Sequence, residues 1–158
     1  MEYENVSEWI ALTNWQEPLL TSHFDRYWYF IKALADPRDN NRQQAIACLN
    51  TIKDHRLPVF VSLPTIFESH RRFLFSLGQV AATHFLQNIY DGSVNIVRTV
   101  EDDEQEGIRL IERYEGLRIT MTDAVNMAVM VRLGMAASFS FDRHYLQAGF
   151  IRIPPFHL

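Results

Sequence analysis

The sequence contains a single cysteine, Cys48, among its 158 residues. One cysteine excludes an internal disulfide framework and a zinc site built from cysteines. No uninterrupted apolar run reaches the roughly 18 to 20 residues that a membrane-spanning helix requires. The first residues, MEYENVSEWIALTNWQ, are acidic and polar and lack the basic segment and cleavage pattern of a signal peptide. These absences predict a cytoplasmic protein that does not enter a membrane.

Basic residues are also scarce. The chain has 15 lysines and arginines against 19 aspartates and glutamates, and its net charge is −4. It therefore lacks a broad cationic surface for nucleic acid, so a polyanionic substrate would need local basic side chains or bound metal ions. The remaining composition, 47% hydrophobic and 22% charged, is that of a globular protein, and the length suits one domain.

Segments with strand character alternate with segments that have helical spacing. Strands are expected at 57–63, 94–100, 137–141 and 150–154. Helices are expected at 65–78, 79–92 and 101–116, and from a cap at Thr122 or Asp123 to Gly134, with Gly78 and Asp91-Gly92 as the expected ends of the first two. A further helix is expected over 42–55, and a strand running into a helix over 23–34. Such alternation predicts an α/β fold with parallel strands.

Three local details follow from the same patterns. Pro64 is expected to end the strand over 57–63. Thr122 or Asp123 is expected to cap the helix that follows residue 120. The inward-facing residues of the helix over 101–116 are expected to be Ile108, Ile111 and Tyr114.

The first 22 residues differ from the rest of the chain. Residues 1–22 are interpreted as an N-terminal extension with a short helix that Pro18 breaks, and residues 23–158 as the main domain. Trp9 and Trp15 are available to cover the core or to mediate dimerisation.

Two aspartates interrupt the apolar run over 119–145. Asp123 falls at a helix start and Asp142 just past a strand, and chemistry in α/β sheets gathers at the carboxyl ends of strands. Taken alone, each has a simpler explanation as a helix cap, which stabilises a helix by about 0.5 to 2 kcal/mol. Glu68 alone would be a solvated helix residue.

The segment TMTDAVNMAVMVRLGMAASFSFDRHYLQAGFIRIP resembles the C-terminal half of a PIN domain, the nuclease fold of VapC-type toxins and related ribonucleases. The matching motifs are Thr120-Met-Thr-Asp123, Leu133-Gly134, Phe139-Ser-Phe-Asp142 and Gly149-Phe150. Upstream, LPVFVSLPTIFESHRRFLFSLG resembles the strand and helix that carry the family's acid, here Glu68. The resemblance covers residues 24–155 and implies a three-layer fold, with a central, mostly parallel sheet flanked by helices.

One position departs from the family pattern. The family's first aspartate falls on Tyr27, whereas Asp25 lies two residues earlier and is followed by Arg26 instead of threonine or serine. Positions two apart on a strand share a face, so we expect Asp25 to take that place.

The resemblance implies four catalytic residues, Asp25, Glu68, Asp123 and Asp142. Their carboxylates are hard oxygen ligands that suit Mg²⁺ or Mn²⁺, with Asp25, Asp123 and Asp142 as the metal ligands. Metal-activated water would then hydrolyse the phosphodiester bonds of RNA and leave a 5′-phosphate. Substrate contacts are assigned to Thr122, Arg71, Arg72 and Arg143, with Thr120 as the alternative hydroxyl.

The predicted function is that of a metal-dependent endoribonuclease, the toxin of a toxin–antitoxin pair, with RNA and an antitoxin as partners and a homodimer as its assembly. The alternative is a degenerate PIN domain that binds RNA or protein without cutting, which Tyr27 and the residue after Asp25 favour. A nuclease of RNA maturation or DNA repair would share the same site. Metal binding separates the enzyme from the binding module.

Overall fold

The computed structural model describes residues 21–22, 42–43, 46–47, 50, 54–56, 58–92, 94–139 and 144–153. The expected strand and helix over 23–34 lie outside this part of the chain, as does the expected extension apart from its last two residues. The division at residue 22 stays a prediction. Within the helix expected over 42–55, the described positions 42–43, 46–47, 50 and 54 are helical.

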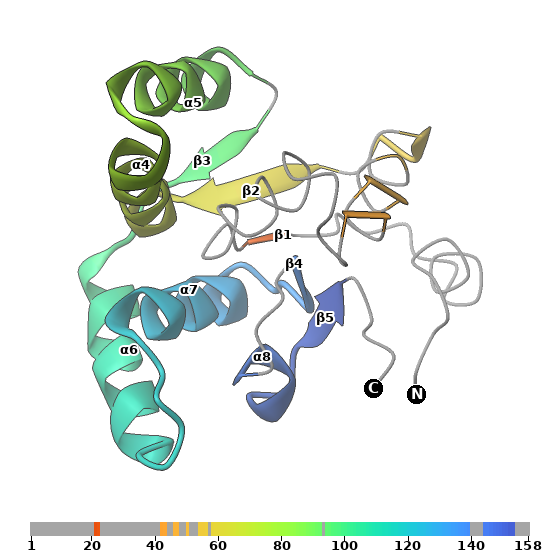
Figure 1. Ribbon diagram of the computed structural model, residues 1–158. Helices are drawn as coiled ribbons and strands as arrows, with labels where there is room; N and C mark the ends of the chain where they lie inside the picture. The colour runs from red at the N-terminus through yellow and green to blue at the C-terminus, as the bar shows by residue number, and fades with distance from the viewer. Residues whose placement is uncertain are drawn as a thin grey trace.

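The strands form parallel pairs. β1 (Thr21–Ser22) pairs with β2 (Val59–Ser62), and β2 pairs with β3 (Asn95–Val97). β4 (Ala137–Phe139) pairs with β5 (Ile151–Ile153). The strands thus form a three-stranded sheet in the order β3-β2-β1 and a two-stranded sheet β4-β5, and β1 lies beside β4 (Figure 1). The predicted α/β fold with a parallel sheet is confirmed.

The helices gather in two groups. α4 (Leu63–Leu77) and α5 (Gln79–Asp91) pack together beside β2 and β3. α6 (Glu101–Arg113), α7 (Met121–Arg132) and α8 (His144–Gln147) lie toward β4 and β5 (Figure 1). Among the described residues, no helix is long and apolar enough to cross a membrane.

Each helix group has its own apolar core. The first core joins β2, α4 and α5, and its rings Phe73 and Phe85 stack at 4.7 Å. The second core joins α6, α7 and α8. Its buried members are Leu110, Ile119, Ala124, Met127, Ala128, Met130, Met135 and Tyr145. Since α7 is buried along most of its length, the residues at its start are held by packing as well as by helix geometry.

We expected Pro64 to end a strand, but this was wrong: it lies in the first turn of α4. Ser62 is the N-cap, and its Oγ accepts a hydrogen bond from the Thr65 N–H at 3.3 Å. A proline suits this position because its fixed φ and missing N–H cost nothing in the first helical turn. β2 therefore passes directly into α4 at Ser62. At the other end of α4, Gly78 has a φ of 86° and separates α4 from α5, as expected.

The expectation that Ile108 faces the core was wrong. Ile108 is 44% exposed, whereas Gly107 and Leu110 are buried on the side of α6 that contacts α7. The reason is a close helix contact, because a Cβ on Gly107 would lie 3.0 Å from Val125 Cγ2 and 3.1 Å from its backbone nitrogen. Gly107 has no apolar side chain, so the apolar pattern of the sequence does not reveal the helix face that it provides.

Candidate active site

The start of α7 is fixed by a reciprocal capping box. The N-cap is Thr120, not Thr122 or Asp123 as expected, and Asp123 is the third helical residue. The Asp123 N–H donates to Thr120 Oγ1 at 3.1 Å. In return, Asp123 Oδ2 accepts hydrogen bonds from the Thr120 hydroxyl at 2.8 Å and from the Thr120 N–H at 3.2 Å. Thr120, not the half-buried Thr122, is the threonine whose hydroxyl binds this carboxylate.

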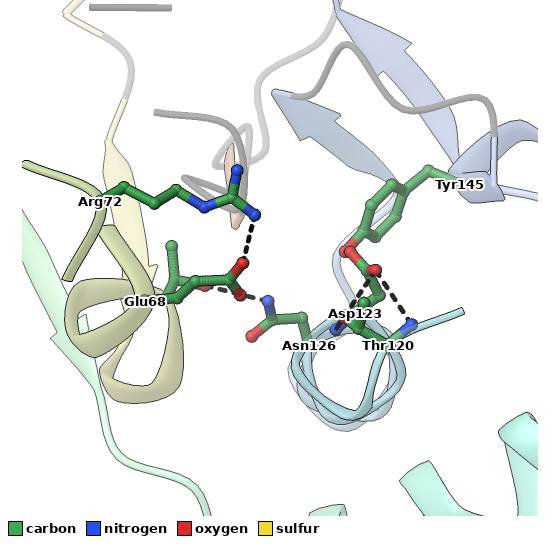
Figure 2. A network of polar contacts seen from close by, with 7 residues as sticks. Glu68, Arg72, Thr120, Asp123, Asn126 and Tyr145 are labelled. Atoms are coloured by element: carbon green, nitrogen blue, oxygen red, sulfur yellow. Dashed lines mark hydrogen bonds and ion pairs between the residues drawn. The ribbon is translucent and has the colours of Figure 1, made fainter. Parts of the chain in front are cut away.

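Asp123 has a second anchor that helix capping does not require. Only 2% of the residue is exposed, and its Oδ1 accepts a hydrogen bond from the hydroxyl of Tyr145 in α8 at 3.2 Å. Figure 2 shows Tyr145 reaching the carboxylate from the side opposite the helix start. A cap stabilises a helix without being buried, so burial and a tertiary contact set Asp123 apart from an ordinary cap.

Glu68 lies on α4, on the side that faces α7 (Figure 2). Its Oε1 forms an ion pair with Arg72 Nη2 at 2.5 Å, one helical turn further on. The Glu68 side chain is partly buried, so it is not the freely solvated residue that its sequence context suggests. Arg71, the neighbouring basic residue, is exposed.

A buried polar network links the two helices that carry these acids. Asn126 of α7 donates from Nδ2 to Thr65 Oγ1 at 2.9 Å. The Ser62 hydroxyl lies 2.5 Å from Asn126 Oδ1 and 2.9 Å from Thr65 Oγ1. All three residues are buried. Asn126 follows Asp123 by one turn and lies between it and Glu68 in Figure 2, so the network fixes α7 against the start of α4.

This network was not predicted from the sequence. The feature that indicated it was Asn126, an asparagine within the apolar run AVNMAVM, three residues after Asp123. A polar residue on the buried face of a helix requires a hydrogen-bond partner, and here the partners come from the β2–α4 junction.

The structure brings together only part of the expected acidic set. Asp25, Asp142 and Arg143 lie outside the described residues. Within the described ranges, no group of three or more histidine, cysteine, aspartate or glutamate side chains is placed to hold a metal ion. Glu68 and Asp123 supply carboxylate oxygens, the donor type that Mg²⁺ and Mn²⁺ prefer, so the described part of the site fits such an ion chemically. The assignment of Asp25 and Asp142 as further metal ligands stays a prediction.

No family model and no curated protein matches the sequence. Solved structures do match. VapC20 of Mycobacterium tuberculosis, described as a toxin that cleaves the sarcin-ricin loop, has a TM-score of 0.70 at 20% identity, over 86% of this chain and 99% of its own. FitAcB of Neisseria gonorrhoeae has a TM-score of 0.61 at 16% identity, over 88% and 99%.

A third similar structure is VapBC2 of Rickettsia felis, described as bound to a DNA fragment from its promoter. It has a TM-score of 0.61 at 12% identity, over 84% of this chain and 96% of its own. At such identities the likeness concerns the fold. The expected architecture is confirmed, and the chain has a VapC-type PIN-domain fold.

Proposed function

We propose that the protein is a metal-dependent endoribonuclease that hydrolyses phosphodiester bonds of RNA. The observation that carries the proposal is the buried Asp123 carboxylate, which is anchored at both oxygens and lies across Asn126 from Glu68. The similarity to VapC20, which is described as a toxin that cleaves the sarcin-ricin loop, supports a nuclease activity.

The anchors of Asp123 suit a carboxylate that must keep its charge. Thr120 and Tyr145 are neutral donors, which orient a carboxylate without neutralising it. Asp103, which among the described residues is buried to the same degree, is held by the guanidinium of Arg132. A buried charge is costly, and such sites are common where a protein binds a cation or performs chemistry.

The strand order supports the placement of the remaining acids. Asp25 follows the end of β1 by three residues in the sequence, and Asp142 follows the end of β4 by three. β1 and β4 are neighbours, and parallel sheets place functional side chains beyond the carboxyl ends of their strands. We therefore propose that Asp25 takes the place of the family's first aspartate and that Asp142 lies beside it.

Asp25, Asp123 and Asp142 would hold Mg²⁺ or Mn²⁺, with Glu68 as a further ligand or as the group that orients water. The bound ion would supply an activated water and stabilise the charge that develops on the phosphate. The Thr120 cap and Tyr145 orient Asp123, and the Asn126 network fixes the spacing of α7 and α4. Contacts to RNA phosphates are assigned to Arg71, Arg72, Arg143 and Thr122.

The proposal extends to an antitoxin partner and a homodimer. Three similar structures support this part of the proposal: FitAcB, FitAB and VapBC2. FitAB and VapBC2 are described as bound to DNA fragments, which is consistent with a nuclease that acts within a regulated complex. Co-expression with a neighbouring open reading frame, followed by sizing of the purified protein, tests both parts of this assembly.

The function is tested by measuring Mn²⁺ binding by calorimetry and cleavage of single-stranded RNA on the same samples. Asp123→Asn and Asp25→Asn should lose both, whereas Asp102→Asn, an exposed aspartate in the first turn of α6, should retain both. Circular dichroism must show that all variants are folded. A wild-type protein that neither binds metal nor cuts RNA would refute the proposal and leave a PIN domain that binds RNA or protein without catalysis.

A further inference from the structure

Tyr145 has the largest side chain among the fully buried residues of the described part of the chain. Its ring packs in the core formed by α6, α7 and α8, with the ring of Phe150 at 6.3 Å. The apolar environment explains the ring but not the hydroxyl, since a phenylalanine would fill the same space. A buried tyrosine hydroxyl requires a polar partner, and here it donates to Asp123 Oδ1.

The hydroxyl completes the anchoring of the carboxylate. Thr120 binds only Oδ2, and the terminal torsion of an aspartate side chain is broad, so a single anchored oxygen leaves the plane of the carboxylate poorly defined. Tyr145 binds the second oxygen from a different element, 22 residues further along the chain. With both oxygens bound, the fold sets the plane of the carboxylate and therefore the direction in which it faces a cation.

The same hydrogen bond connects two parts of the proposed site. α8 begins at His144, two residues after Asp142 in the sequence, and Tyr145 is its second residue. The bond to Asp123 therefore ties the beginning of α8 to the beginning of α7 (Figure 2). Of the proposed ligands, Asp123 lies in α7, and Asp142 precedes α8 by two residues in the sequence.

We propose that Tyr145 is a positioning residue that orients the Asp123 carboxylate for cation binding. The inference rests on the proposed function, because it assumes that Asp123 is a metal ligand. Groups that hydrogen-bond a metal ligand typically change metal affinity by about 10- to 100-fold when they are removed. The conservative change Tyr145→Phe removes the hydroxyl and keeps the ring.

The test measures the Mn²⁺ dissociation constant of wild type, Tyr145→Phe, Asp123→Asn and Tyr114→Phe. Tyr114 is a matched control because it is a partly buried tyrosine against the same core. Tyr145→Phe should weaken Mn²⁺ binding by about 10-fold or more, and Tyr114→Phe should bind like wild type. If Tyr145→Phe is unstable, its affinity is obtained from the shift of its urea midpoint with Mn²⁺, since a ligand of the native state stabilises it by an amount that depends on the logarithm of the ligand concentration relative to its dissociation constant.

Affinity separates positioning from a merely structural role, which would lower stability without changing the dissociation constant of the folded fraction. If Tyr145→Phe binds Mn²⁺ within about twofold of wild type while Asp123→Asn does not bind, the inference about Tyr145 is overturned and the proposed function stands. If wild type itself does not bind Mn²⁺, both are overturned.

Discussion

An ion pair between Asp103 and Arg132 joins the beginning of α6 to the end of α7, the helix that carries Asp123. The guanidinium contacts both carboxylate oxygens, with Nε 2.7 Å from Oδ1 and Nη2 2.8 Å from Oδ2. The Val100 N–H adds a third hydrogen bond to Oδ2 at 2.9 Å. The Asp103 side chain is 1% exposed and that of Arg132 is 35% exposed, so the pair is buried on the acidic side.

The perturbation is Arg132→Gln, which leaves the Asp103 carboxylate buried without its cation. Removing one partner of a fully buried pair costs about 3 to 5 kcal/mol. Because Arg132 is one-third exposed, water already screens part of the interaction, and we expect a loss of about 2 to 3 kcal/mol of unfolding free energy. The double change Asp103→Asn with Arg132→Gln should cost less than the sum of the single changes, because it leaves no unpaired charge.

The effect has a defined pH dependence. Burial raises the pKa of Asp103, but the hydrogen bonds from Arg132 and Val100 and the charge of Arg132 outweigh it and hold that pKa below the ordinary 3.8. A lowered pKa stabilises the fold above the unfolded-state value, and this contribution is lost as pH falls through the folded-state value. Without Arg132 the opposing effect of burial dominates. The stability gap between wild type and Arg132→Gln should therefore shrink as the solution is acidified.

The assay is urea unfolding followed by circular dichroism, at neutral pH and again near pH 4. Arg113→Gln, in the last turn of α6, is the control for the loss of an exposed arginine and should change stability by less than about 0.5 kcal/mol. An Arg132→Gln variant as stable as wild type at neutral pH, or a gap that does not change with pH, would refute the reasoning.

Two further predictions concern the α6–α7 contact and the Glu68 ion pair. Gly107→Ala places a Cβ 3.0 to 3.1 Å from Val125, so it should lower the free energy of unfolding in urea by about 1 to 3 kcal/mol, although alanine has the better helix propensity. Gly116 has open space around it, so Gly116→Ala should leave that free energy nearly unchanged. Equal stability of the two variants would contradict the close contact. Arg72→Gln removes the cation that competes for Glu68. Mn²⁺ affinity should rise by up to about fivefold, the equivalent of the 1 kcal/mol upper limit for a partly exposed pair. Calorimetry beside the exposed control Arg71→Gln checks this, and weaker binding by Arg72→Gln would show that the pair supports the site.

The sequence alone determined the local elements and the fold class. α4 ended at Gly78 and α5 at Gly92, the glycines expected to end them, because helical periodicity and turn conformations depend on residues a few positions apart, whereas α6 ended at Arg113, before Gly116. The motif around Asp123 and Asp142 was enough to expect a PIN-like fold, which the likeness to solved structures confirmed. The resemblance also singled out Asp123 and Glu68 as candidate site residues, although each taken alone has a simpler explanation.

The tertiary structure decided which side chains meet. The cap expected at Thr122 or Asp123 was wrong. Thr120, Thr122 and Asp123 can all cap a helix, and only the position of the first helical turn shows that Thr120 is the N-cap. The contacts of Asn126 with Ser62, and of Tyr145 with Asp123, join residues 64 and 22 positions apart. Periodicity within one segment says nothing about such partners. They are set by how α7 packs against α4 and α8. Because of that packing, the Asp123 carboxylate is buried and is bound at both oxygens, in addition to its part in the capping box of α7.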